Sequence, residues 1–245
     1  WANGGNWGEG SAPTASSTVV IPATLAPGKP WPVLVGADAE AGSLTLNPGS
    51  QLDVNGHKVT VSGAAVITGA TVANSGAGAI RIDVGVLSGG SSYIRSSTFT
   101  AALDFKTSGT SLLYEADNTG ANTYEGDVKF TIAASGDHNI SNSYRSLFKG
   151  NLTIERTASG TTNVFTSNEA TSVAVKGNFT YQNHSGGNTT IGGTDKKAIM
   201  EKAVNIDVET TASNPSFTLR RLDNKNGTGG GTISVINPGT VNIIS

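Results

Sequence analysis

A short pattern of apolar and polar residues recurs four times between residues 124 and 208. Each copy begins with a bulky apolar residue, a charged residue, a Gly, and an Asp or Asn, and it ends in alternating apolar, polar and apolar residues. The copies are Tyr124–Phe130, Phe148–Ile154, Val175–Tyr181 and Met200–Ile206, of which the last lacks the Gly and the Asp or Asn. Their third positions, Gly126, Gly150, Gly177 and Lys202, are 24, 27 and 25 residues apart. A period of this length is typical of a solenoid.

The pattern within one repeat predicts short strands joined by turns. Alternation at the end of each copy puts both apolar side chains on one face of a strand, and the Gly before it suits a bend that a side chain would obstruct. A repeat of about 25 residues without a helix fits one coil of three strands, which must stack on neighbouring coils to bury its apolar face. The fold class that we predict is all-β, a right-handed parallel β-helix (β-solenoid) of about ten coils. Asn151 and Asn178, at equivalent positions, are predicted to be turn or ladder residues whose side chains bond to backbone.

Other segments carry the same kind of alternation. Turn signals lie between them at Asn47-Pro48-Gly49 and Asn55-Gly56. Ile233–Ile243 echoes Leu44–Val54, including an Asn-Pro-Gly corner, which favours one continuous solenoid. At most one helical turn is expected, over residues 195–198. The further strands that we expect cover residues 44–46, 52–54, 59–61, 66–67, 79–84, 93–95 and 103–105.

Residues 1–35 differ in composition from the rest of the chain. They contain all three tryptophans (Trp1, Trp7 and Trp31) and five of the eight prolines. We interpret this segment as an irregular cap on one end of the solenoid, because an open solenoid end would template aggregation. The alternative is a carbohydrate-stacking platform formed by the three tryptophans. The domain organisation that we expect is a cap over 1–35 that is continuous with a solenoid over 36–245.

The opening of the chain resembles a known class of proteins. The residues concerned are Asn6-Trp7, Pro13, Ser17–Pro22, Pro32-Val33-Leu34 and Gly42–Leu46, followed by the phrase apolar-x-Gly-Asn-Leu-Thr-Ile. This run resembles the opening of β-solenoid segments in large secreted, adhesin-like cell-surface proteins of Bacteroidota that use type IX secretion. The resemblance implies an extracellular β-helix on the bacterial cell surface, with no catalytic residues to carry over. A C-terminal secretion domain is not apparent.

Composition and charge exclude some partners. Gly makes up 32 of 245 residues, and charged residues are 14%, against about a quarter in typical domains. The net charge is −2 and the basic residues are scattered, which argues against nucleic acid as a partner. No apolar run is long enough to span a membrane, so we expect no membrane insertion. The chain starts at Trp1 without a Met, which is expected of a mature product or of a piece of something longer. Cys is absent.

The sharpest candidates for chemistry are acidic residues between apolar ones. Asp53, Asp83, Asp104 and Asp207 could bind Ca²⁺ or act as paired carboxylates on a sugar, if they fell on one face at successive coils. Their spacings of 30, 21 and 103 residues share no period, which favours a solvated outer face. We therefore predict no catalytic residues, no metal site and no cofactor, and Asp53, Asp83, Asp104, Trp1, Trp7 and Trp31 remain as residues that could face a ligand.

The histidines and the basic residues carry weaker signals. His57, His138 and His184 are far apart in turn-like settings, so we expect exposed loop residues. A carbohydrate-active β-helix enzyme, a polysaccharide lyase or hydrolase, would need acids or a basic side chain in a groove. The basic residues available for that role are Arg81, Arg95, Arg145 and Arg156.

Three classes of function follow. The first is a structural or adhesive segment without catalysis, a stiff stalk roughly 50 Å long that displays other modules. Its partners would be the remainder of a larger surface protein, glycans or other surface proteins. The second is the carbohydrate-active enzyme, and the third is a glycan-binding module that uses the tryptophans.

Overall fold

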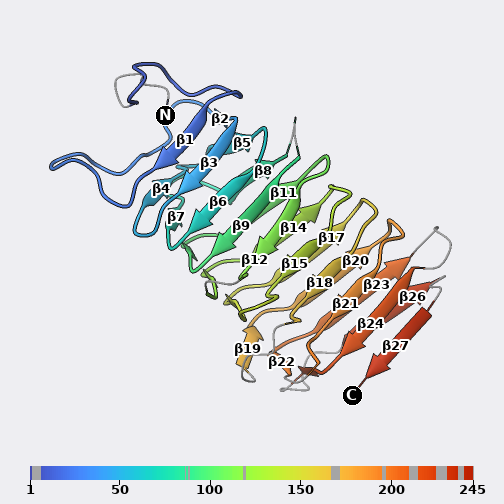
Figure 1. The fold of residues 1–245 in the computed structure, drawn as a ribbon. Helices are drawn as coiled ribbons and strands as arrows, with labels where there is room; N and C mark the ends of the chain where they lie inside the picture. Colours follow the sequence, from blue (N-terminus) through green and yellow to red (C-terminus); the bar gives the residue numbers. More distant parts are fainter. Residues whose placement is uncertain are drawn as a thin grey trace.

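The structure is a computed structural model, and it describes residues 1, 7–85, 87, 89–117, 120–166, 172–194, 197–209, 215–224, 231–236 and 240–244. These residues form 27 strands and no helix. The strands stack into three parallel sheets, which run side by side along an elongated body from the N-terminal to the C-terminal end (Figure 1). The predicted all-β parallel solenoid is confirmed.

The three sheets are named A, B and C. Sheet A contains β1 (Thr18–Ile21), β3 (Ser43–Leu46), β6 (Ala65–Thr68), β9 (Ser91–Arg95), β12 (Leu112–Glu115), β15 (His138–Ile140), β18 (Thr162–Val164), β21 (Thr189–Ile191), β24 (Ser216–Arg220) and β27 (Thr240–Ile244). Sheet B contains β4 (Gln51–Asp53), β7 (Thr71–Ala73), β10 (Thr98–Phe99), β13 (Thr123–Tyr124), β16 (Leu147–Phe148), β19 (Ser172–Val175), β22 (Ala198–Met200) and β25 (Leu222–Asn224). Sheet C contains β2 (Ala39–Ala41), β5 (Lys58–Val61), β8 (Ile80–Val84), β11 (Leu103–Thr107), β14 (Val128–Ile132), β17 (Leu152–Arg156), β20 (Phe179–Asn183), β23 (Val204–Glu209) and β26 (Thr232–Ile236).

One turn of the solenoid takes one strand from each sheet in the order A, B, C. From β3 to β26 this order repeats without a break and makes about eight complete turns, with β1 and β2 before them and β27 after them. The expected number of about ten coils was therefore too high. Eight stacked turns at the spacing of neighbouring strands give a body about 40 Å long.

The four-fold repeat maps onto this architecture in register. The bulky apolar residue of each copy lies in sheet B, where Tyr124, Phe148, Val175 and Met200 pair in sequence. The alternating segment of each copy lies in sheet C, where Val128 pairs with Leu152, Leu152 with Phe179, and Phe179 with Val204. Each copy of the pattern is therefore the corner between sheets B and C together with the strands on either side of it.

The glycines of the repeat stack directly on one another at this corner. A Cβ on Gly150 would lie 2.6 Å from the carbonyl carbon of Gly126, and a Cβ on Gly177 would lie 2.5 Å from that of Gly150. Neither contact leaves room for a side chain, because the neighbour is backbone of the coil beneath. The Gly is therefore required by the close approach of successive coils, at a position where the pattern predicted a bend that a side chain would obstruct.

The predicted asparagine ladder follows the glycines. The amide nitrogen of Asn151 donates to Oδ1 of Asp127 at 2.8 Å, and the amide nitrogen of Asn178 donates to Oδ1 of Asn151 at 2.8 Å. The side chains of Asp127 and Asn151 thus each satisfy a backbone donor of the next coil, and for Asn151 this is the side-chain bonding to backbone that its position predicted.

Inward-facing side chains fill the interior in continuous columns. Stacked aromatic rings form part of one column, with ring centroids 5.1 Å apart for Phe99 and Tyr124 and 4.7 Å apart for Tyr124 and Phe148. Phe165 and Phe179 meet edge to face at 5.3 Å. Almost every core position is fully buried, so the coils form one hydrophobic core along the axis.

The strands expected over residues 44–105 are confirmed as β3, β4, β5, β6, β8, β9 and β11, within one or two residues at the ends. The short strands β7 and β10 were missed. The expected helical turn over 195–198 falls partly on residues outside the described ones, and Ala198 begins β22. The two similar segments, Leu44–Val54 and Ile233–Ile243, lie at different corners of the solenoid. The first passes from sheet A to sheet B, and the second passes from sheet C to sheet A.

Candidate functional site

The three tryptophans gather at the N-terminal end of the solenoid. Trp1 is buried, and its ring meets that of Trp7 edge to face with centroids 5.0 Å apart. The Nε1 of Trp7 donates a hydrogen bond to the carbonyl oxygen of Trp1 at 2.8 Å. Trp7 and Trp31 are partly buried and pack against the hydrophobic core. The tryptophans therefore both cover apolar side chains of the solenoid and expose part of their own ring surface.

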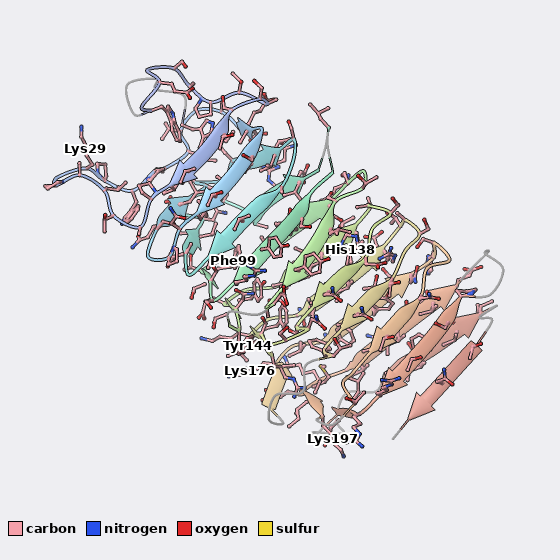
Figure 2. The ribbon with its side chains drawn as sticks, viewed as in Figure 1. Lys29, Phe99, His138, Tyr144, Lys176 and Lys197 are labelled. Atoms are coloured by element: carbon pink, nitrogen blue, oxygen red, sulfur yellow. The ribbon has the colours of Figure 1, made fainter. Side chains whose placement is uncertain are left out.

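A cavity of about 400 Å³ lies among these rings. Its walls are mainly apolar, and the one charged side chain that lines it is Lys29. Lys29 belongs to the long loop that extends from the N-terminal end of the body (Figure 2). The full lining consists of Trp1, Trp7, Leu25, Ala26, Lys29, Pro30, Trp31, Pro32 and Val33. We call this feature the tryptophan cavity.

One wall of the tryptophan cavity is hydrogen-bonded to the solenoid. The amide nitrogen of Asp53 donates to the carbonyl oxygen of Pro32 at 3.0 Å, and that of Leu34 donates to the carbonyl oxygen of Asp53 at 2.8 Å. Val33 and Asp53 thus form a parallel bridge at the edge of β4. Pro30 and Pro32 also restrict the backbone on both sides of Trp31. These contacts tie this wall of the cavity to β4.

Trp1 also carries an unsatisfied polar group. The Nε1 of Trp1 is buried and has no hydrogen-bond partner within the described part of the chain. A buried indole N–H normally finds an acceptor.

The candidate acids do not form a group. Asp53, at the end of β4, accepts hydrogen bonds from the amide nitrogens of Asn55 and Ser75, both at 2.9 Å. Burial raises the pKa of the Asp53 carboxyl, but the hydrogen bonds from Ser75 and Asn55 outweigh it, so the pKa is lowered. Because Ser75 belongs to the next coil, Asp53 ties two coils together at a turn.

Asp83 and Asp104 lie on the outward face of sheet C, on the neighbouring strands β8 and β11. Each stands opposite a cation: Asp83 pairs in register with Lys106, and Asp104 with Arg81. The Nζ of Lys58 also lies 3.5 Å from Asp83. Asp207, in β23, is on the same face five strands beyond Asp83, and it contacts His184 at 3.1 Å. Asp83 and Asp104 therefore stand opposite basic residues rather than opposite each other.

No group of three or more histidines, aspartates and glutamates suited to a metal ion occurs among the residues that the structure describes.

His138 was predicted to be an exposed loop residue, and this prediction was wrong. It lies in β15, fully buried among the central coils (Figure 2). Its Nδ1 accepts a hydrogen bond from the amide nitrogen of Leu113 at 3.1 Å. Burial and the nearby charge of Arg156 lower the pKa of His138 from 6.5 to about 4, so it is neutral in the folded protein at neutral pH. His57 and His184 are partly exposed.

Glu115 and Arg156 are also buried in the core, where sequence reasoning did not place them. Glu115 is fully buried, and burial raises its pKa in spite of the hydrogen bonds that it accepts. Arg156 is 1% exposed, and five N–H donors face oxygen atoms of the surrounding backbone and one hydroxyl. The donors to Glu115 are Asn122, Tyr124, Ser141 and Ser146, and the acceptors around Arg156 are in Gly136, Ala158, Ser159, Thr161 and Thr162. Alternation alone assigned outward or inward positions, and it does not reveal that an inward position is charged.

A pair of stacked tyrosines lies on the outward face of sheet A. The ring centroids of Tyr93 and Tyr114 are 5.3 Å apart, and the guanidinium of Arg95 sits 3.9 Å from the centroid of Tyr93. Arg95 also pairs with Asp117 at 3.2 Å. These rings already contact one another and a cation, so less ring surface is free here than in the tryptophan cavity.

Comparison with known proteins finds no match: no protein-family description, curated protein or solved structure resembles this chain significantly. A helix able to cross a membrane is not found in the described part of the chain.

Proposed function

We propose that this chain is a structural segment of a secreted protein on the surface of a bacterial cell, where it acts as a stiff stalk that displays other modules and does not catalyse a reaction. The observation that carries the proposal is the continuity of the interior. In sheet C each strand from β2 to β26 pairs in parallel with the next, and the inward residues remain in register throughout.

Stiffness follows from this continuity. Bending the body would separate inward side chains of neighbouring coils. These side chains are close-packed and almost fully buried. The stacked rings of Phe99, Tyr124 and Phe148, and the ladder from Asp127 to Asn178, add contacts that a bend would break. A stalk requires this property, whereas a loosely packed domain would not supply it.

The location belongs to the same proposal. It is supported by the resemblance of the opening residues and of the Gly-Asn-Leu-Thr-Ile phrase to adhesin-like β-solenoid segments of Bacteroidota exported by type IX secretion. The partner would then be the remainder of a larger surface protein or assembly, with surface glycans or proteins as contacts.

The alternative of a polysaccharide lyase or hydrolase has less support from the geometry. Asp53 bonds to backbone at a turn, while Asp83 and Asp104 stand opposite basic residues. Two of the basic residues considered for this role, Arg145 and Arg156, are buried. A degradative activity on polyuronates that is lost in Asp83→Asn and Asp104→Asn variants would restore this alternative.

The proposal is tested on intact cells that make the protein, using antibodies raised against this chain. We expect labelling of unpermeabilised cells, removal of the label by external protease, and electron micrographs in which the labelled segment is a straight rod. Labelling that requires permeabilisation would overturn the location. A flexible or compact labelled body would overturn the stalk.

A further inference from the structure

We propose that the tryptophan cavity binds a pyranose sugar that carries a carboxylate, such as a uronic acid residue of a polysaccharide. This inference goes beyond the stalk and does not rest on it, because the cavity is a local feature of the N-terminal end. The ligand is inferred from the size of the cavity, its ring surface and its one charged side chain, Lys29.

Size and wall chemistry indicate a small cyclic ligand. A volume of about 400 Å³ lies within the range of roughly 300–1,000 Å³ that is typical of small-molecule sites. The wall contains three indole rings, whose faces carry partial negative charge. The C–H groups on one face of a pyranose carry partial positive charge, so they can stack on an indole while the hydroxyl groups at the ring edge remain in water.

The charge of the cavity wall favours an acidic ligand. Among the lining residues Lys29 is a cation and no acid is present, so a negative charge on the ligand is favoured over a positive one.

The wall that holds Trp31 needs little reorganisation to bind. The backbone bonds of Pro32 and Leu34 to Asp53 fix it against β4, and the two flanking prolines limit its movement. A binding site that is already ordered avoids part of the entropy cost of association.

The chain provides its own probe for the test. All three of its tryptophans line the cavity, so intrinsic tryptophan fluorescence reports on this site alone. The protein is titrated with tetragalacturonate and with the neutral galactotetraose at low salt. We expect a saturable change in fluorescence with both sugars, and binding of the acidic sugar that is about fivefold tighter and weakens as salt is added.

Three variants locate the binding. Trp31→Ala removes a partly exposed ring and is expected to abolish binding, as measured by calorimetry. Lys29→Ala is expected to remove the preference for the acidic sugar while binding of the neutral sugar remains. Lys106→Ala, which removes an exposed lysine of sheet C, is the matched control and should bind as the unchanged protein does. Circular dichroism checks that each variant is folded.

Several outcomes would overturn the proposal. These are no saturable response to either sugar, equal affinity for the two sugars that Lys29→Ala does not change, or full binding by a folded Trp31→Ala variant. Binding of a proline-rich peptide in place of both sugars would also overturn it. A failed titration leaves the cell-surface labelling unaffected, so the two proposals stand or fall separately.

Discussion

At the scale of single residues, the interior of this solenoid contains ionisable groups whose burial shifts their pKa values. His138 and Glu115 are both fully buried, on neighbouring strands of sheet A. The shifts have opposite consequences for stability, because burial opposes protonation of the histidine and favours protonation of the acid.

For His138 we predict a loss of stability in acid. In the folded state His138 is protonated only near pH 4, whereas in the unfolded chain it is protonated near pH 6.5. The stability contributed by neutral His138 is therefore present above pH 6.5 and is lost as pH falls toward 4, by about 3 kcal/mol at most. His138→Gln keeps an acceptor for the Leu113 amide and should flatten this dependence, measured as urea unfolding between pH 7 and pH 4. An unchanged pH profile in the variant would show that other groups cause it.

For Glu115 we predict the opposite dependence. Its pKa is raised above 4.5 in the folded state, so its contribution is fully present below that value and is lost as pH rises through the raised folded pKa. Glu115→Gln should remove this component. It should also cost about 1–3 kcal/mol, because both carboxylate oxygens accept N–H donors and one of them becomes an NH₂ group.

The control for Glu115 is Glu125, an exposed residue whose carboxylate pairs with Lys149 at 2.8 Å. Glu125→Gln should change the free energy of unfolding by less than about 1 kcal/mol. Equal effects of the two substitutions in urea unfolding would contradict the distinction.

At the scale of elements, the corner between sheets B and C depends on space rather than on an unusual backbone angle. Gly126, Gly150 and Gly177 are not among the glycines with positive φ, yet the coil beneath leaves no room for a Cβ on any of them. The corner thus explains why one small residue recurs while its neighbours vary.

We predict that Gly177→Ala destabilises the protein by about 1–3 kcal/mol, because its Cβ would overlap the backbone of Gly150 and force the coils apart. Gly8→Ala is the matched substitution, since Gly8 has no atom within 4 Å of the added Cβ and a negative-φ backbone. It should leave the midpoint of thermal unfolding unchanged. Tolerance of alanine at position 177 would mean that the corner relaxes more easily than the stacked backbones indicate.

At the scale of the whole molecule, the stability that an inward side chain contributes depends on whether a further coil covers it. Leu219 and Ile243 are paired in register in the same column of sheet A, but Leu219 is 8% exposed and Ile243 is 68% exposed. The column thus places one aliphatic side chain in the core and another in solvent.

We expect Leu219→Ala to cost about 2–4 kcal/mol and Ile243→Ala to cost less than about 1 kcal/mol, because only the first leaves a cavity between packed coils. Denaturant unfolding of both variants measures the difference. Comparable losses would indicate that Ile243 is covered in solution.

The sequence by itself determined the repeating unit and the way in which successive units stack. The period near 25 residues, the alternation and the recurring Gly and Asn predicted stacked parallel coils, and each of these features has a local physical cause in pleating, turn geometry or side-chain bonding to backbone. Strands as short as β10 were not detectable, and the role of residues 1–35 as a cap stays a prediction. Part of that segment, β1, pairs with β3 in sheet A.

Only the tertiary structure decided which residues meet. It placed His138 and Arg156 in the core, set Asp83 and Asp104 opposite cations, and brought Trp1, Trp7 and Trp31 around one cavity. The physical reason is that alternation fixes the face on which a side chain lies, while its neighbours across coils depend on the exact length of every turn. Here the spacing between repeats varies from 24 to 27 residues. The pattern alone therefore leaves open which side chains of successive coils come into contact.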